Sequence, residues 1–251
     1  MAEWLGGGLQ NLIRRFESAR NLKTGQERAS SFSIRIQKIF DYDVGVAMLT
    51  KLYSENPNPK QIEAIVKTLR EGGVIIYPTD TVYGIGCDIH NQKAVERIAR
   101  IKGVKPEKAD FSFICRDLSH LSEYARQVPN PVFKLMKRHL PGPFTFILNA
   151  SSKVPKLLES KKKTVGIRIP ANKIVAEIVE QLGNPLLSTS IHFDDEMIEY
   201  ATDPELIYEK YGEMVDLVVD GGYGGIEFST VVDCTGDEPE IIRQGSGILE
   251  F

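Results

Sequence analysis

From about residue 55 onward, stretches with apolar residues at helical spacing alternate with short apolar runs typical of strands. Apolar residues at helical spacing, preceded by Asn, Asp or Pro, predict helices within 59–71, 91–103, 117–124, 131–139 and 172–182, and another from 203. Short apolar runs predict strands at 74–77, 111–115, 144–148, 164–169, 185–188, 215–219, 230–233 and 240–243. Helices that alternate with strands indicate one α/β domain, and two hairpin-like stretches favour a mixed sheet.

The stretch from 72 to 88 reads Gly-Gly-Val-Ile-Ile-Tyr-Pro-Thr-Asp-Thr-Val-Tyr-Gly-Ile-Gly-Cys-Asp. Its apolar run should end at Pro78, because proline cannot donate a hydrogen bond to a sheet. Short polar side chains follow at once, and Gly84 and Gly86 then permit a sharp turn or a close approach of the backbone. The residues alone leave two interpretations open: a ligand site at the end of a buried strand, or a strand followed by a tight turn.

Hydroxyl-bearing and basic side chains recur at the other predicted strand ends and loops. Cations and hydroxyls without an obvious nucleophile–base pair suit an anionic ligand, which they would hold by charge and position. Each has an ordinary structural explanation when taken singly. Arg168 fits a structural ion pair, Lys102 fits a helix-terminal cation, and Ser188 to Ser190 fits a polar turn.

The run Pro78-Thr79-Asp80-Thr81-Val82-Tyr83-Gly84 resembles the signature of the YrdC/YciO family, which includes the threonylcarbamoyl-AMP synthases. Further similar segments are Pro-Gly-Pro-Phe-Thr at 141–145, Val-Gly-Ile-Arg-Ile-Pro at 165–170, Ser-Thr-Val-Val-Asp at 229–233 and Arg-x-Gly at 243–245. The similarity spans about residues 55 to 249. It implies a YrdC-like fold for residues 48–251: a single domain with a twisted mixed parallel and antiparallel sheet and helices around an open cleft.

The resemblance also implies a reaction, in which L-threonine, bicarbonate or CO2, and ATP give threonylcarbamoyl-AMP and pyrophosphate, with Mg2+ bridging phosphates. The product would serve a partner threonylcarbamoyl-transferase complex that modifies tRNA. Carried over by motif, the roles fall on nine residues. These are Lys102 and Arg168 as catalytic, Thr79, Tyr83 and Thr145 as substrate-binding, and Ser188, Ser190, Ser229 and Arg243 as nucleotide-binding residues. A second hypothesis is a module that binds nucleotide or double-stranded RNA with weak or no synthesis.

Two departures fall in diagnostic motifs of the synthases. Where those have Lys-x-Arg, this chain reads Lys102-Gly103-Val104-Lys105-Pro106, so the arginine is replaced by Val104 or displaced to Lys105. Where those have Ser-x-Asn, this chain has His192 in place of the asparagine. Both departures favour the YciO branch and weak synthesis, because lysine cannot reproduce the bidentate fork of arginine.

Residues 1–47 differ in pattern from the rest. Leu12, Ile13, Phe16 and Ala19 would share one side of a short helix beside several arginines. A transit peptide and a poorly ordered terminus are both compatible with this pattern. We expect a dispensable extension, and Met48, just before the similarity begins, is a candidate start of translation. The extension carries a net charge of +2 and residues 48–251 carry −5, within a chain total of −3; the acidic domain weighs against tight RNA binding.

Composition excludes several classes. The three cysteines lie far apart with no C-x-x-C spacing, and the four histidines are scattered, so neither a disulfide framework nor a metal site is expected. No apolar run reaches the length of a membrane span. We therefore expect a cytoplasmic protein without a membrane partner.

Overall fold

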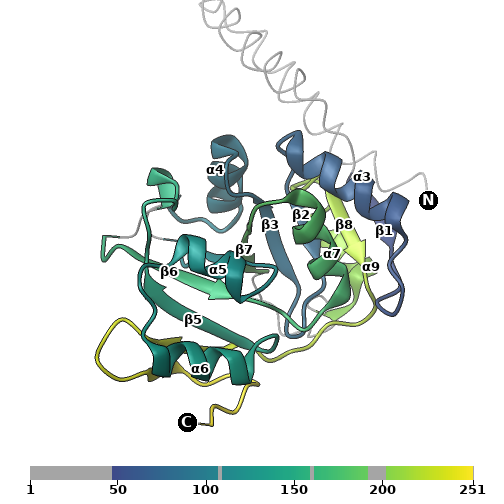
Figure 1. Ribbon diagram of the computed structural model, residues 1–251. Coiled ribbons are helices and arrows are strands. Elements are labelled where there is room, and N and C mark those ends of the chain that lie inside the picture. Colours follow the sequence, from purple (N-terminus) through teal and green to yellow (C-terminus); the bar gives the residue numbers. More distant parts are fainter. Residues whose placement is uncertain (1–46, 107–108, 159–160, 192–201, 251) are drawn as a thin grey trace, which may run out of the picture. The chain divides into compact units, whose positions relative to one another are not determined.

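The structure is a computed structural model that describes residues 47–106, 109–158, 161–191 and 202–250 (Figure 1). The predicted helix near Leu12 and the substituted His192 lie outside the described residues. The described residues belong to one structural unit, Val46–Phe251. Ala47, which the sequence-based boundary assigns to the extension, is buried in this unit, and its N–H donates to the carbonyl of Gly212.

Ten strands of the described chain form one sheet, in the order β1-β8-β2-β3-β7-β4-β6-β5-β9-β10. Their bounds in that order are Met48–Lys51, Leu217–Asp220, Ile75–Tyr77, Gly84–Asp88, Leu186–Ser190, Ser112–Ile114, Thr164–Arg168, Phe144–Asn149, Thr230–Asp233 and Glu240–Arg243. The pairs β1/β8, β2/β8, β4/β6 and β5/β9 are parallel, and the other neighbours are antiparallel. The predicted mixed sheet of a single α/β domain is confirmed.

The predicted helices are also present, and most begin at the capping residues that the sequence indicates. Side chains of Asn58, Asn91, Asp117, Asn172 and Asp203 each accept a backbone N–H at a helix start. The helices are α3 (Pro59–Arg70), α4 (Gln92–Ile101), α5 (Leu118–Tyr124), α6 (Asn130–His139), α7 (Lys173–Leu182) and α9 (Pro204–Tyr211), with a short 3-10 turn, η2 (Lys156–Leu158). Within the described residues, no helix is long and apolar enough to cross a membrane.

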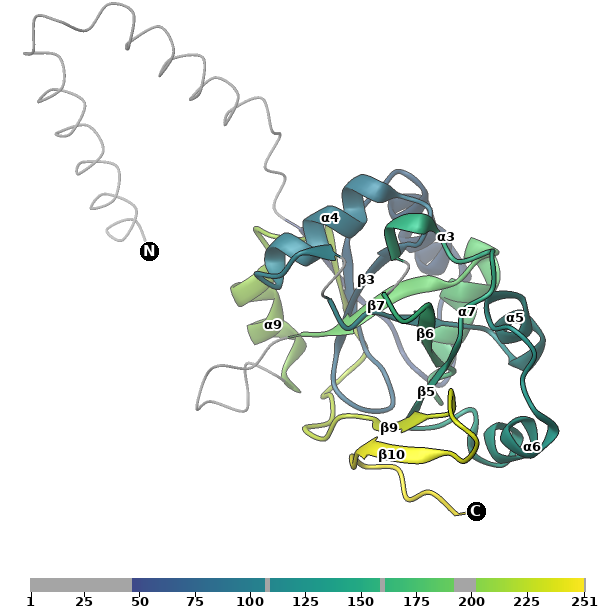
Figure 2. The same cartoon turned by 90° about the vertical axis from the view of Figure 1, so that its left-hand side faces the viewer.

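Two hydrophobic clusters fix the helices to the sheet. The buried faces of α3 and α7 meet β2, β8 and one end of β7, and the two helices lie side by side (Figures 1 and 2). The larger cluster packs α4, α5, α6 and α9 against the other face of the sheet. Its strand residues alternate along the chain with those of the first cluster, because successive side chains point to opposite faces. Because α3 and α7 cover only part of their face, residues farther along the sheet stay open to a ligand.

Two strands were not predicted. β1 is a short edge strand whose pattern is too brief to read. β3 begins at Gly84 and includes Gly86, two glycines for which the sequence left a sharp turn and a close backbone approach both open. A Cβ on Gly84 would lie 3.0 Å from the Tyr77 ring, and a Cβ on Gly86 would lie equally close to it. The glycines therefore permit a close approach, as the alternative interpretation held, but the approach is to a tyrosine across a strand.

Candidate functional site

A cavity of about 670 Å³ opens over the central strands beyond α3 and α7. Its floor is a cross-strand row of small side chains, in which Ser188 of β7 pairs with Ser112 of β4, and Ser112 pairs with Gly166 of β6. Registered partners share one face of a sheet. A row of glycine and serine therefore leaves room above the sheet that larger side chains would fill.

Tyr77 closes one end of this row. Its ring belongs to the apolar cluster under α3 and α7, and its hydroxyl donates to Ser188 Oγ. Burial raises the pKa of the Tyr77 phenol well above its usual range, so the group stays a neutral donor. This bond holds the hydroxyl of Ser188, which lines the cavity, in place.

Arg168, at the end of β6, is the most buried cation of the described site, with 7% of its side chain exposed. Its Nη2 donates to Asp80 Oδ1 at 3.1 Å and to Thr81 Oγ1 at 3.0 Å. Burial lowers the pKa of Arg168, although the Asp80 carboxylate opposes that shift. Its Nε is buried and has no hydrogen-bond partner among the described residues. A buried donor without a partner is costly and calls for an explanation.

A second polar cluster lies at the opposite end, where β5, β9 and β10 meet. Thr145 Oγ1 and Ser229 Oγ are 2.8 Å apart and both are buried. Arg243 of β10 donates through Nη2 to the Ser229 carbonyl at 2.9 Å, and its guanidinium lies 5.3 Å from the centre of the Phe228 ring. Among the described residues these contacts orient the guanidinium without a hydrogen bond to a carboxylate, and burial lowers the pKa of Arg243.

The altered Lys-x-Arg motif lies at the rim. Lys102 is the C-cap residue of α4, and its Nζ donates to the Ser190 carbonyl at 2.9 Å. Val104 lines the cavity with 42% of its surface exposed, whereas Lys105 is exposed and does not line it. An apolar side chain thus stands on the rim where the resemblance expects a cation.

Seven of the nine residues assigned from the sequence line this one cavity: Lys102, Thr145, Arg168, Ser188, Ser190, Ser229 and Arg243. Thr79 and Tyr83 are not among its lining residues. The Tyr83 hydroxyl donates to the carbonyl of Gly222 at 2.6 Å and accepts the N–H of Gly221 at 3.2 Å. Both assignments as substrate-binding residues stay predictions. In this structure the Thr79 hydroxyl bonds within its own loop, and the Tyr83 hydroxyl joins that loop to Gly221 and Gly222.

Sequence reasoning missed three contributors. Ser112 and Gly166 form the floor, and Asp80 holds the guanidinium of Arg168. The small residues carry a weak signal, because single serines and glycines in strands are common. Asp80 was visible in the signature run, but its partner lies 88 residues away, and nothing local identifies such a pair.

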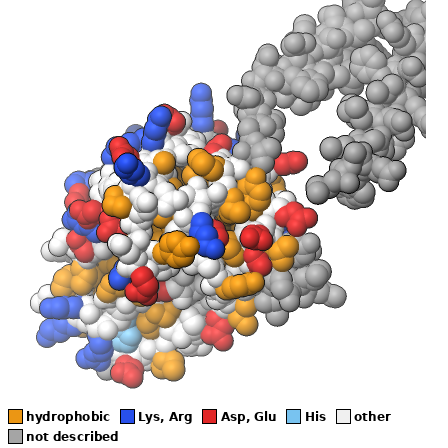
Figure 3. Space-filling view, turned by 90° about the vertical axis from the view of Figure 1, so that its right-hand side faces the viewer, with side chains coloured by type: hydrophobic (Ala, Val, Ile, Leu, Met, Phe, Trp, Pro, Cys, Tyr) orange, Lys and Arg blue, Asp and Glu red, His pale blue; other side chains and the backbone are white. Residues whose placement is uncertain are grey.

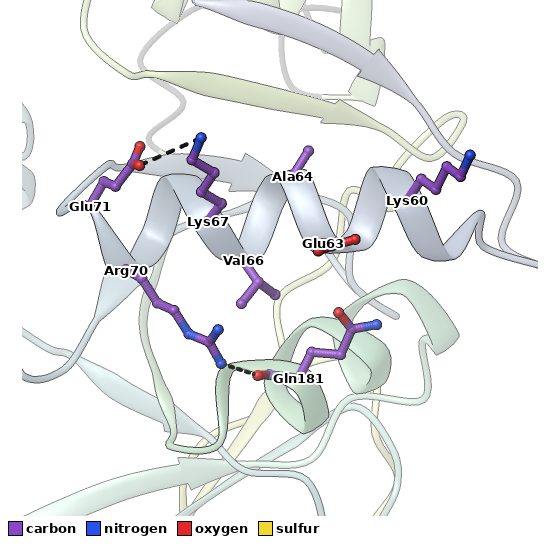
Figure 4. Close-up of a pocket in the computed structure, with 8 residues that line it drawn as sticks. All are labelled: Lys60, Glu63, Ala64, Val66, Lys67, Arg70, Glu71 and Gln181. Carbon is purple, nitrogen blue, oxygen red and sulfur yellow. Dashed lines mark hydrogen bonds and ion pairs between the residues drawn. The ribbon is translucent and has the colours of Figure 1, made fainter.

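Other parts of the described surface are weaker candidates for a ligand site than this cavity. The face drawn in Figure 3 intersperses acidic, basic and hydrophobic side chains, without a field of one sign. A hollow of about 510 Å³ between α3 and α7 is lined mostly by charged residues of both signs (Figure 4). There Lys67 pairs with the exposed Glu71, and Arg70 donates to the Gln181 carbonyl. Within the described residues no cluster of His, Cys, Asp and Glu could hold a metal ion.

The geometry defines a class: an α/β protein whose single mixed sheet carries a cleft lined by hydroxyls and guanidinium groups. A family model for Sua5, YciO and YrdC proteins, described as "Telomere recombination", matches residues 67–245. The chain belongs to this Sua5/YciO/YrdC family.

Known proteins similar to the chain fall in two groups. "Uncharacterized protein YciO" of Escherichia coli is 44% identical over 78% of this chain and 94% of its own length. The crystal structure of E. coli YciO matches with a TM-score of 0.75 at 42% identity, over 81% of this chain and 98% of that one.

The second group is more distant. The threonylcarbamoyl-AMP synthase of Halorhodospira halophila is 30% identical over 69% of this chain and 90% of its own. The structure of Pyrococcus abyssi Sua5 complexed with L-threonine matches with a TM-score of 0.72 at 27% identity, over 79% of this chain and 58% of that one. The predicted family and YrdC-like fold are confirmed.

Proposed function

We propose that the chain is a nucleotidyltransferase of the threonylcarbamoyl-AMP synthase type. L-threonine, bicarbonate or CO2, and ATP would be its substrates, and threonylcarbamoyl-AMP and pyrophosphate its products. The product would pass to a threonylcarbamoyl-transferase complex that modifies tRNA. Three buried free thiols suit a reducing compartment such as the cytoplasm.

One observation carries this proposal: seven side chains chosen by motif, from four strands, one loop and one helix end, line the same cavity. They supply three cations and four hydroxyls, and Arg168 retains a buried Nε without a partner. Such a site would hold phosphate and carboxylate groups by charge-assisted hydrogen bonds. Phosphoryl and nucleotidyl transfer depend chiefly on this kind of positioning and charge stabilisation.

The chemistry would proceed in two bond-forming steps. The threonine amine adds to CO2, forming the N–C bond of a carbamate and releasing a proton to water. A carbamate oxygen then attacks the α-phosphorus of ATP, the bond to the β-phosphate oxygen breaks, and pyrophosphate leaves. Lys102 and Arg168 would offset the charge that accumulates, while Ser188, Ser229 and Arg243 would hold the nucleotide.

Mg2+ would arrive with ATP, since the described residues offer it no cage of their own. Asp110 is a carboxylate that lines the cavity. Mg2+ commonly takes one or two carboxylates together with substrate phosphates, so this donor set fits the metal. The ion would supply charge neutralisation of the phosphates.

The direct test is incubation with labelled L-threonine, bicarbonate and Mg-ATP, followed by chromatographic detection of threonylcarbamoyl-AMP and pyrophosphate. A Lys102→Ala variant serves as the matched negative. Absence of product from the natural chain, with ATP binding retained, would eliminate the synthase proposal.

The apolar side chain of Val104 on the rim favours a second candidate function. In this alternative the chain is a YciO-type protein that binds nucleotide or double-stranded RNA and makes little threonylcarbamoyl-AMP. Val104 stands where an arginine contact is expected. Losing one charge-assisted contact to a developing anion costs about 2–4 kcal/mol, or roughly 30- to 1000-fold in rate. RNA binding would lose affinity steeply with salt, so filter binding at two salt concentrations distinguishes this candidate.

Restoration of the motifs separates the two candidates. Val104→Arg with Lys105 deleted rebuilds Lys-Gly-Arg-Pro, and His192→Asn rebuilds Ser-x-Asn. We expect the combined variant to make at least tenfold more threonylcarbamoyl-AMP than the parent. A variant that folds and binds ATP but gains nothing would point to a different natural ligand.

A further inference from the structure

In the signature loop between β2 and β3, the threonine hydroxyls donate their hydrogens to other atoms of the same loop. Thr79 Oγ1 donates its only hydrogen to the carbonyl of Val82 at 2.7 Å. It therefore accepts in its 3.0 Å contact with Thr81 Oγ1, and it also accepts the Thr81 N–H at 3.0 Å. Thr81 Oγ1 in turn accepts from Arg168 Nη2. The hydrogen bonds thus run in one direction, from the guanidinium into the loop.

Asp80 completes the loop's hold on Arg168. Its Oδ1 accepts from Arg168 Nη2 at 3.1 Å, and its Oδ2 accepts the N–H of Ala171 at 2.9 Å. About 10% of the Asp80 side chain is exposed, so the pair is nearly dry. Asp80 and Thr81 together occupy Nη2 of Arg168, a residue that lines the cavity, while Nε is buried without a partner among the described residues.

We propose that Asp80 is a positioning residue, which acts with Thr81 to hold the Arg168 guanidinium in the orientation that an anionic substrate in the cavity requires. The signature loop then serves the site by holding a cation 88 residues away, and its threonine hydroxyls are structural. This inference rests on the proposed function in one respect, that an anion occupies the cavity beside Arg168.

Asp80 could orient the Arg168 guanidinium or only neutralise its charge, and these two roles predict opposite changes in anion affinity. In Asp80→Asn the amide keeps the shape but loses the charge, and its NH2 must face either the Arg168 or the Ala171 donor. If Asp80 aims the guanidinium, anion affinity falls. If Asp80 only cancels the charge of Arg168, its removal leaves an uncompensated cation, and anion affinity rises.

The matched control is Asp216→Asn. Asp216 also pairs with an arginine, Arg97, at 2.6 Å and accepts a backbone N–H, that of Val74, but it does not line the cavity. Binding of ATP, pyrophosphate, L-threonine and uncharged adenosine is measured by calorimetry on the full chain. We expect Asp80→Asn to weaken at least one anion that the parent binds by fivefold or more, with adenosine and the control unchanged.

Two further measurements make the outcome decisive. In an Arg168→Lys background, which lacks the fork, Asp80→Asn should change anion affinity by less than twofold. The ¹⁵Nε–H resonance of Arg168, assigned by its loss in Arg168→Lys, should shift or broaden in Asp80→Asn and not in Asp216→Asn. Because breaking a buried pair can unfold a protein, Thr81→Val is a second variant, expected to shift the same resonance.

An unchanged or tighter anion affinity in folded Asp80→Asn would overturn the positioning role. So would an Arg168 resonance that neither variant moves. If the parent binds none of the anions, the proposed function fails, and the resonance alone then decides whether Asp80 positions Arg168.

Discussion

Replacing the glycine on the floor of the cavity by a larger residue tests where the ligand lies while leaving the fold intact. Gly166 of β6 lies between Ser112 and Ile147 of the neighbouring strands. A Cβ there would meet the Phe111 carbonyl oxygen and Thr145 Cγ2 at 3.5 Å, and Ser112 Cβ at 3.6 Å. These are ordinary contact distances, so alanine should fit. Replacing glycine within a strand should leave stability unchanged or raise it by about 0.5–1 kcal/mol.

A side chain added at Gly166 also occupies space in the cavity that a ligand would otherwise fill. Forcing a well-fitted group against a new methyl costs about 1–3 kcal/mol, which corresponds to roughly 5- to 150-fold in affinity. We expect Gly166→Ala to weaken binding of ATP or L-threonine a few-fold and Gly166→Val to weaken it by at least tenfold. Calorimetry measures the affinity, and a thermal melt of each variant measures the fold.

Gly86→Ala is the contrasting control, since its Cβ would collide with the Leu187 carbonyl and press on the Tyr77 ring. A backbone carbonyl in a ladder cannot move aside, so this variant should melt several degrees earlier. The reasoning fails if Gly166→Val keeps the parent's melting temperature and binds both substrates as tightly as the parent, because the substrates would then lie elsewhere.

Three further predictions follow from burial and charge. Lys102→Ala should weaken ATP or product binding about tenfold with the fold intact, because a charged hydrogen bond contributes about 1.5–3 kcal/mol; unchanged binding would make Lys102 a helix-end cation only. Deleting residues 1–45, which spares the buried Ala47, should change the melting temperature by a few degrees at most, and a large drop would mean that the extension packs on the domain. Burial raises the pKa of Cys87 and Cys115, and that of Cys234 to about 12. The unfolded chain therefore loses thiol protons first, from about pH 8.5, and urea titrations should show stability falling above that pH; native thiols that react readily with Ellman's reagent at pH 8 would contradict this burial.

Local chemistry made the helices predictable. A capping side chain and the first turn that it caps lie within a few residues, so Asn91 and Asn172 identify their helices without knowledge of the rest. The strand from Ile75 to Tyr77 ends at Pro78 for an equally local reason. The family resemblance then added what periodicity cannot, the assembly of these elements around one cleft.

Long-range partners limited the rest. The alternating glycines of β3 left a turn and a close approach equally open, because the sequence does not show that the Tyr77 ring lies against them. A glycine-rich loop joins β8 to β9 in the chain, and nothing local in it shows that the two strands lie far apart in the sheet. The substrate-binding role of Thr79 stays a prediction from its motif; in this structure its hydroxyl bonds locally, to Thr81 and Val82.

The motif residues divide by what their polar atoms contact. Thr79 and Tyr83 bond within the protein and link the signature loop to itself and to the Gly221–Gly222 turn. Arg168 and Arg243 keep part of their guanidinium surface for the cavity. Val104 belongs to neither group and lies on the rim. A change at the rim alters contacts to a ligand without disturbing the hydrogen bonds that build the loop. Fold and nucleotide affinity can therefore persist while turnover falls, so binding and turnover have to be measured on the same variants.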